Sequence, residues 1–420
     1  MSKKLFSKTI VLGIITVVVI AVITITSCSK IMPEMINPEN GLCGPVSLSS
    51  AQTVVFSQGN NEFFATRTAS SGLGPYFVGT GCGGCHSSDN RGHPFTILTR
   101  YGQSDTTGNK FLSEGGPQLG NFCLPGLQAE QVPPGASSTK LIAPITAGVG
   151  FLEAVPDSEI INMAAANVNN PDGVRGHPNY NTRPYLYNTT AYWDVAPLNG
   201  SVPRADGKWL CRFGRKASTY SLLQQVAQAY NHDIGITSTF LPFNPYNYQD
   251  QTVPASPSNP EVGNATLNSV VFYCQCLQTP IQRNPTDPQV VSGNTIFNQI
   301  GCASCHKPTL TTGNSPISAL ANQTINPFTD LLVHDMGPGL DDGYTEGDAK
   351  TSEWRTTPLW GLGLASSVQG GNVYLLHDGR AHSITQAIQM HGGEAAVAAG
   401  RFNSLSGSDQ AVILKFLESL

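Results

Sequence analysis

Two copies of the pattern Cys-x-x-Cys-His are the segments of this chain whose residue types and spacing most directly imply chemistry. They occupy residues 82–86 and 302–306. In such a segment both thiols lie on one side of a helical turn and can add to the vinyl groups of a porphyrin, while the histidine turns its imidazole toward the iron. The sequence therefore predicts two covalently bound haem c groups, held by Cys82, Cys85, His86, Cys302, Cys305 and His306.

Two other interpretations of these motifs compete with haem. A zinc site would need both cysteine pairs folded together, and it would not need a histidine after each pair. A thioredoxin-like dithiol would not usually occur twice in one exported chain. Because the complete motif occurs twice, we favour haem, with His86 and His306 as proximal iron ligands.

The sixth ligand of each iron decides whether that iron can bind a substrate or only store an electron. Most of the remaining histidines are expected to be surface or capping residues. These are His93, His177, His232, His334, His377, His382 and His391.

Composition excludes several classes of function. The 420 residues carry 23 Lys and Arg against 28 Asp and Glu, a net charge of −5, which removes the basic footprint of a nucleic-acid-binding protein. Only 12% of residues are charged and 40% are hydrophobic, so the chain is not of the disordered class. With 43 Gly and 29 Pro, long loops are expected.

The first 27 residues resemble a bacterial lipoprotein signal. Three lysines precede an apolar run over residues 10–25, and small residues then lead to Cys28. We expect the signal to be removed and Cys28 to carry a lipid, which would tether the protein to a membrane on the periplasmic side of the cell envelope. The alternative is a transmembrane anchor, for which the apolar run is short.

The remainder predicts a mainly α protein with long irregular loops. Apolar residues at helical spacing mark helices over 218–229, 383–391 and 408–420. Residues 241–264 contain many prolines and asparagines, which favours a loop.

Prolines 280, 285 and 288 indicate a domain boundary close to residue 286. We therefore expect a tether and N-terminal segment over 28–70, a first haem domain with large loop insertions over 71–285, and a second haem domain over 286–420. A glycine and an aromatic residue precede each motif, and we assign these as Gly74/Phe77 and Gly293/Phe297.

From about residue 70 onward the chain resembles the dihaem oxidoreductases grouped as peroxidases or thiol oxidoreductases. More distantly it is similar to bacterial dihaem cytochrome c peroxidases. The resemblance implies two cytochrome c-like domains and allows a calcium ion between them and a homodimer. It is carried by GP at 74–75, SSDNRG at 87–92, FLEAVP at 151–156, RFGRKA at 212–217, DLLVHDMG at 330–337, EWRTTPLWG at 353–361, HDGRA at 377–381 and HGGEA at 391–395.

The resemblance also suggests ligands for the second haem. The axial position of the relatives falls on His391, with Met390 beside it as the alternative. His377 is expected to be a structural residue beneath this haem. His334 and Met336 lie in another matched segment and could contact a haem edge.

For the first haem, residues 213–217 and the helix at 222–229 resemble the cover of the peroxidatic haem. No ligand falls clearly on it, although Tyr230, His232 and His93 are close in sequence. We expect an open or exchangeable site there.

Glu153 is the candidate for moving a proton between the peroxide oxygens, because it lies in a matched segment among apolar neighbours. The alternative is a buried structural glutamate that holds a backbone or propionate partner. The tryptophans could connect the haems electronically, or they could simply pack in the core. They are Trp193, Trp209, Trp354 and Trp360.

Five cysteines remain besides Cys28 and the motifs, namely Cys43, Cys123, Cys211, Cys274 and Cys276. Cys274 and Cys276 could form a reactive dithiol. The commoner outcome outside the cytoplasm is two structural disulfides among the five.

These observations predict a peroxidase-like dihaem oxidoreductase. The second haem would accept electrons from a small redox donor protein or a quinol-linked cytochrome, and the first would bind hydrogen peroxide. The alternatives are a pure electron-transfer cytochrome, supported by a strong distal ligand on the first haem, and an oxidase of a thiol or protein substrate.

Overall fold

The computed structural model describes five stretches of the chain, which are residues 45–86, 92–106, 109–182, 201–250 and 255–420. The expected lipoprotein signal, its Cys28 and the unassigned Cys43 lie outside them. Within these stretches, no helix is both long enough and apolar enough to cross a membrane.

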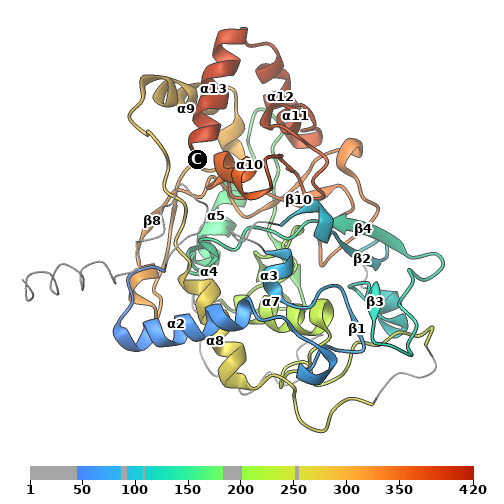
Figure 1. Cartoon of the computed structure of the whole chain (residues 1–420). Coiled ribbons are helices and arrows are strands. Elements are labelled where there is room, and N and C mark those ends of the chain that lie inside the picture. Colours follow the sequence, from blue (N-terminus) through green and yellow to red (C-terminus); the bar gives the residue numbers. More distant parts are fainter. Residues whose placement is uncertain (1–44, 87–91, 107–108, 183–200, 251–254) are drawn as a thin grey trace, which may run out of the picture.

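Two crossed helix pairs form the framework of the fold. Helix α2 (Ser50–Phe63) packs against α8 (Asn264–Cys276), and α9 (Pro288–Gln299) packs against α13 (Gly407–Ser419). The two pairs lie at opposite ends of the molecule, with α4 and α5 between them (Figure 1).

Both pairs cross at a glycine that allows the backbones to approach closely. A Cβ atom on Gly59 would lie 2.0 Å from the Ser269 carbonyl oxygen, and one on Gly293 would lie 2.3 Å from that of Val412. Each glycine is followed one turn later by a phenylalanine. The crossing therefore repeats in both halves of the chain.

The aromatic contacts repeat as well. The ring centroids of Phe63 and Tyr273 are 5.2 Å apart, and those of Phe297 and Phe416 are 5.4 Å apart. The repeated pair before the first motif is thus Gly59/Phe63, and the assignment of Gly74/Phe77 was wrong. Gly74 packs instead against the backbone of Gly235.

The other helices are short and are joined by irregular segments, which agrees with the predicted mainly α class. They are α3 (Cys82–Cys85), α4 (Val149–Glu153), α5 (Asp157–Asn167), α7 (Leu222–Gln228), α10 (Ala365–Val368), α11 (Ile384–Gln389) and α12 (Ala396–Asn403). A π-helical turn (Ala229–Asp233) continues α7, and a 3₁₀ turn (Cys302–Ser304) carries the second motif.

The strands form small two-stranded antiparallel sheets. These pair β1 (Tyr76–Phe77) with β3 (Phe122–Cys123), β2 (Leu98–Gly102) with β4 (Ser137–Leu141), β5 (Asn179–Asn181) with β6 (Trp209–Cys211), β7 (Leu310–Thr311) with β8 (Thr324–Ile325), and β9 (Val333–Asp335) with β10 (Glu353–Arg355).

The largest hydrophobic core takes residues from both sides of the predicted boundary near residue 286. The larger core surrounds α2, α4, α7 and α8, and it includes α2 residues that were expected in a tether and N-terminal segment. The smaller core lies between α9 and α13. Residues from the C-terminal half also enter the larger core, namely Leu310, Ile317, Leu320, Ile325, Leu331, Leu332 and Trp360.

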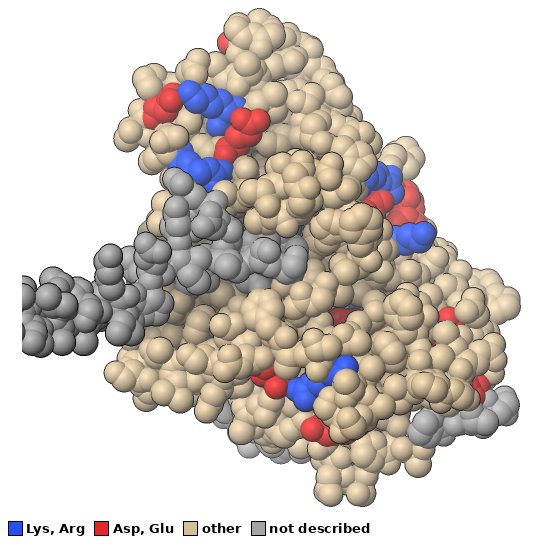
Figure 2. Space-filling model, viewed as in Figure 1, with Lys and Arg blue, Asp and Glu red and all other residues tan. Residues whose placement is uncertain are grey.

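The surface carries few charges. On the face shown in Figure 2, lysine and arginine side chains are scattered and mostly adjoin aspartate or glutamate. The described residues on this face form no broad positive area of the kind that would bind a polyanion.

Candidate functional site

Each Cys-x-x-Cys-His motif lines its own cavity. The first cavity has a volume of about 140 Å³ and is lined by Cys82, Cys85 and His86. The second has a volume of about 230 Å³ and is lined by Cys302, Cys305 and His306. The other lining residues are mostly apolar, as a flat hydrophobic cofactor requires.

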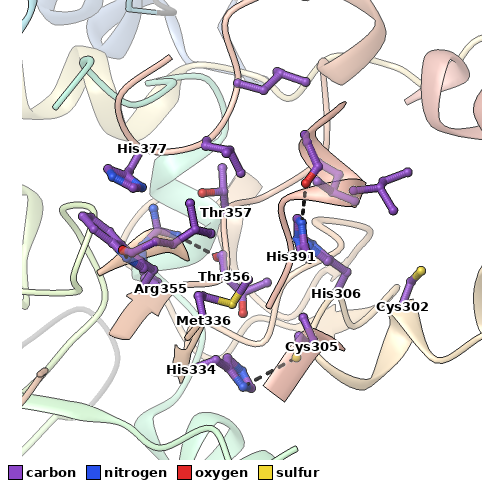
Figure 3. Close-up of a pocket in the computed structure, with 18 of the residues that line it drawn as sticks. Cys302, Cys305, His306, His334, Met336, Arg355, Thr356, Thr357, His377 and His391 are labelled. Atoms are coloured by element: carbon purple, nitrogen blue, oxygen red, sulfur yellow. Dashed lines mark hydrogen bonds between the residues drawn. The ribbon is translucent and has the colours of Figure 1, made fainter. Parts of the chain in front are cut away.

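His306 and His391 face the second cavity together (Figure 3). The Nδ1–H of His306 donates to the Phe328 carbonyl at 2.9 Å, and that of His391 donates to the Ala387 carbonyl at 2.7 Å. Each ring therefore keeps its Nε2 lone pair for another partner. Burial lowers the pKa of His306 to about 4 and also lowers the pKa of His391, so both are neutral at pH 7.

Met390 does not line this cavity. It packs instead against the small core that contains Ala365 and Leu375. Of the two neighbours that the resemblance offered as axial ligands, His391 is therefore the one that shares the second cavity with the motif.

His334 lies in the wall of the second cavity and is held between two carboxylates. Its Nε2 is 2.9 Å from Asp330 Oδ2, and its Nδ1 is 2.8 Å from Glu394 Oε2 and 3.5 Å from Cys305 Sγ. Burial alone would lower the pKa of His334, but the adjacent carboxylates raise it well above its usual value. His334 is therefore a buried cation beside the second motif, and both of its nitrogens are engaged.

His377 and Lys216 enclose the indole of Trp354. The His377 ring stacks on the indole at 3.6 Å between centroids, and Lys216 Nζ lies 3.8 Å from the indole centroid. Two groups this close to one centroid must occupy opposite faces of the ring. The fold thus gives His377 a packing role at the wall of the second cavity.

The tryptophans are distributed unevenly. Trp354 lines the second cavity and Trp360 lines the first. Trp209 lines neither and packs against Tyr220 at 5.1 Å, and Trp193 lies outside the described residues.

His86 is the only histidine that lines the first cavity within the described part of the chain. The three candidates for a distal ligand lie elsewhere. Tyr230 donates its hydroxyl to Glu62 Oε1 at 2.8 Å, His93 caps the turn at Phe95, and His232 lines a separate third cavity of about 300 Å³.

Glu153 does not line either motif cavity. Its Oε1 accepts a hydrogen bond from the Leu222 amide and its Oε2 accepts one from Gln275 Nε2, both at 2.7 Å. The side chain is 4% exposed, and burial raises its pKa. The placement does not support the predicted proton-transfer role and favours the structural alternative, in which Glu153 joins the start of α7 to α8.

Replacing Glu153 with alanine is expected to reduce the free energy of unfolding by about 1–3 kcal/mol, because two buried donors would lose their acceptor. Glu153→Gln should cost less, since one acceptor oxygen remains. Urea unfolding of both variants measures the difference. A Glu153→Ala variant of undiminished stability that nevertheless loses turnover would restore the catalytic assignment.

Asp233 is a lining residue of the first cavity that the sequence did not reveal. It ends the π-helical turn, in which Asn231 and His232 face the third cavity. Burial raises the pKa of Asp233 to about 7, although Arg100 opposes this shift. A π-helical turn is frequent at functional sites and has no sequence signature that separates it from an α-helix.

The raised pKa of Asp233 should make the free energy of unfolding depend on pH. Its pKa is higher in the folded chain than in the unfolded chain, where it is about 4. The folded state therefore holds the proton more tightly, and the free energy of unfolding falls as the pH rises through this window. Asp233→Asn should remove that fall when urea unfolding is compared at about pH 5 and about pH 8. Equal slopes in variant and parent would contradict the prediction.

The two cavities share a wall. Ala143, Ile145, Arg355, Thr357 and Pro358 line both of them. These residues come from two segments that are distant in the sequence, one after β4 and one at the end of β10. The two motifs therefore face a common partition.

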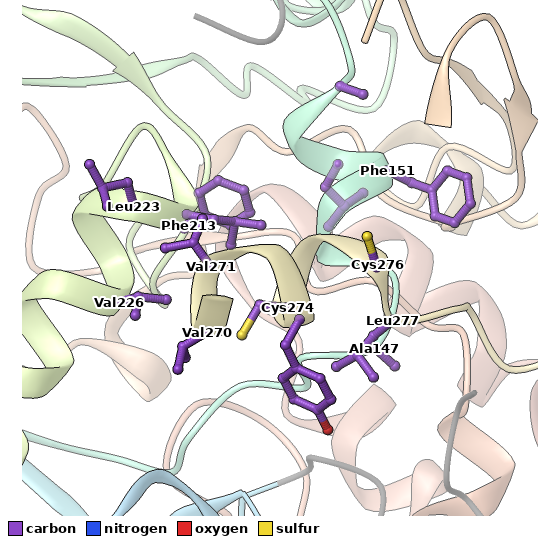
Figure 4. Packing of buried hydrophobic residues seen from close by; sticks show 14 of the residues in the cluster. Ala147, Phe151, Phe213, Leu223, Val226, Val270, Val271, Cys274, Cys276 and Leu277 are labelled. Carbon is purple, nitrogen blue, oxygen red and sulfur yellow. The ribbon is translucent and has the colours of Figure 1, made fainter. Parts of the chain in front are cut away.

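The remaining cysteines do not form the expected disulfides, since all eight cysteines in the described stretches are free. Figure 4 shows the sulfurs of Cys274 and Cys276 on opposite sides of α8. Burial raises the pKa of Cys276 to about 12 and raises that of Cys274 further. The prediction of a reactive dithiol was therefore also wrong, because neither thiol ionises readily nor faces the other.

A family model described as "Di-haem oxidoreductase, putative peroxidase" matches residues 137–420, more than half of the chain. No curated protein matches this chain. Among solved structures, the chain is similar to the hydrazine synthase of Kuenenia stuttgartiensis, determined under xenon pressure. The identity is 12%, the alignment covers 92% of this chain and 93% of that chain, and the TM-score is 0.39.

Proposed function

Because this chain belongs to the di-haem oxidoreductase family, we propose that it binds two covalent haem c groups and uses them to reduce hydrogen peroxide. A family match over the C-terminal two thirds establishes a haem oxidoreductase. The covalent attachment, the substrate and the direction of electron flow are the content of the proposal.

The two cavities fit the cofactor. Each offers a pair of cysteines and one histidine from a single turn, within a predominantly apolar wall. We assign Cys82 and Cys85 to the thioether bonds of the first haem, and Cys302 and Cys305 to those of the second. When bound, haem supplies reversible one-electron storage and an iron that can bind a peroxide oxygen.

The repeated helix crossing supports two cytochrome c-like domains. Phe63 lies 5.9 Å from the His86 ring, and Phe297 lies 6.5 Å from the His306 ring, both measured between centroids. Each helix pair thus packs an aromatic side chain against the proximal histidine of its own motif.

The number of histidines that line each cavity carries the assignment of roles to the two haems. The second cavity presents His306 and His391 with both Nε2 atoms available, whereas the described wall of the first cavity presents only His86. Two histidines make a site suited to holding an electron, and a single one leaves a position for substrate. This asymmetry favours a peroxidase-like enzyme over a pure electron-transfer protein.

Residues of the first cavity would handle the protons. Reduction of hydrogen peroxide to two molecules of water consumes two electrons and two protons. Asp233 can hold a proton at its carboxyl group near neutral pH. The thiol-oxidase alternative loses its main support, because Cys274 and Cys276 are buried and separated.

We extend the proposal to location and partners. A lipid on Cys28 would tether the enzyme in the cell envelope, where a small redox protein or a quinol-linked cytochrome could supply electrons.

Low-temperature electron paramagnetic resonance tests the proposal. The oxidised protein should show one low-spin and one high-spin ferric haem. In the half-reduced protein the second haem holds the electron and gives no resonance, so the high-spin signal should remain, and hydrogen peroxide should abolish it. Peroxide consumption by the reduced protein should accompany that loss. Two low-spin haems that ignore peroxide at both redox levels would overturn the proposal.

A further inference from the structure

Arg355 is a buried cation in the wall that the two motif cavities share. It ends strand β10 and is 8% exposed. Its Nε donates to the Gly214 carbonyl at 2.9 Å, and its Nη1 donates to the Thr356 carbonyl at 3.2 Å. Figure 3 shows it beside Thr356 and Thr357, on the side of the second cavity away from Cys302.

Arg355 forms no ion pair with a carboxylate of the described residues. The two most buried cations nearby differ in this respect, because Arg212 pairs with Asp157 and Lys216 lies 3.1 Å from Asp342 Oδ1. Asp330 acts on Arg355 only through a longer-range attraction.

Arg355 remains charged at neutral pH. Burial lowers its pKa to about 10, which still leaves the guanidinium protonated at pH 7. A buried charge without a counter-ion destabilises a fold, because the charge loses its hydration and gains no partner of opposite sign. Since the described residues supply no such counter-ion, the guanidinium is suited to bind an anionic group that enters the cavities.

We propose that Arg355 binds a propionate carboxylate of each haem and so sets the reduction potential of both haems together. The inference rests on the proposed presence of two haems and adds the group that binds their carboxylates. A guanidinium suits this task because it presents its donors in a planar fork, and the second Nη1 proton and both Nη2 protons of Arg355 remain beside the two bonds to backbone carbonyls.

The positive charge of Arg355 should raise the reduction potentials of both haems. A positive charge near an iron stabilises its reduced form, which carries one positive charge less than the oxidised form. Loss of Arg355 should therefore lower both reduction potentials. Loss of Arg215 should affect the second haem alone, because Arg215 lines the second cavity but not the first.

Arg215 provides the matched control. It is also an arginine with backbone partners, since its Nε and Nη2 donate to the Ile142 carbonyl at 3.1 and 3.0 Å. Each substitution removes one positive charge. Arg355→Gln removes it from the wall that both cavities share, and Arg215→Gln removes it from a part of the wall that lines the second cavity only.

Spectroelectrochemical titration of the holoprotein distinguishes these cases. In Arg355→Gln both haems should become harder to reduce, with the reduction equilibrium of each shifted about tenfold, which is about 59 mV for one electron. In Arg215→Gln only the second haem should shift. Arg355→Lys should restore most of the loss, because the charge remains.

The pyridine haemochrome assay measures the haem content of every variant. It distinguishes failure of the role of Arg355 from failure of the proposed dihaem function. Unchanged potentials, or a shift in one haem only, in an Arg355→Gln protein that holds two haems would refute the role of Arg355 and leave the proposed function standing. A parent protein without two covalent haems would refute the proposed function itself.

If Arg355→Gln fails to fold, the parent protein still decides the question. A crystal structure of the holoprotein should place a propionate oxygen of each haem within hydrogen-bonding distance of the Arg355 guanidinium. Propionates directed away from Arg355 would refute the inference.

Discussion

Replacing Cys302 and Cys305 with serine is expected to leave a protein with one covalently bound haem instead of two. Serine cannot form the thioether bonds, and these cysteines line the second cavity only. The intact mass should fall by one haem group, and the haem absorbance per chain should fall by about half. The remaining haem should be the high-spin one, because the pair His306 and His391 loses its cofactor.

The reciprocal variant, Cys82→Ser with Cys85→Ser, should retain only the low-spin haem. Cys123→Ser is the matched control, since Cys123 is also a free thiol but lines neither motif cavity. It should keep both haems. Zinc in place of haem, or full haem content after loss of the second pair, would contradict the assignment.

Replacing His391 with methionine is expected to raise the reduction potential of the second haem. A thioether sulfur favours ferrous iron more than an imidazole does. The shift should be on the order of 0.1 V or more, within the range of about 0.8 V that axial ligands span. A redox titration followed by visible absorbance measures it, and the first haem reports any general disturbance.

Met390→Leu is the control for this experiment, because Met390 packs in the neighbouring core and does not face the cavity. It should leave both potentials unchanged. If Met390→Leu shifts the second potential while His391→Met does not, the ligand is Met390 and the cavity rearranges when the cofactor binds.

Local patterns made the motifs and three of the helices, α7, α11 and α13, predictable. The five residues of each motif carry their chemistry within one turn, so no knowledge of the fold was needed to find Cys82 or Cys302. The apolar spacing at 408–420 likewise predicted α13, and the resemblance brought His391 to the second motif.

The shared wall was not predictable from local patterns, because it depends on contacts between distant segments. Arg355 and Asp233 are ordinary charged residues in sequence, and their positions in the cavities follow from β10 and from the π-helical turn. For Glu153, by contrast, the sequence suggested a role at the site that its position in the structure does not support. Its apolar neighbours suggested a cavity, but those neighbours belong to the core between α4, α7 and α8.

Part of the shared wall lies late in the sequence, and this determines the order in which the parts of each cavity are synthesised. A chain made from its amino end presents Cys82 and Cys85 long before it contains Arg355, Thr357 and Pro358, which complete the first cavity. Under the proposed covalent attachment, the first motif would therefore stay open to haem during synthesis, whereas the second motif appears shortly before its own wall. A chain that ends before residue 355 would keep both motifs intact and leave both cavities without one side.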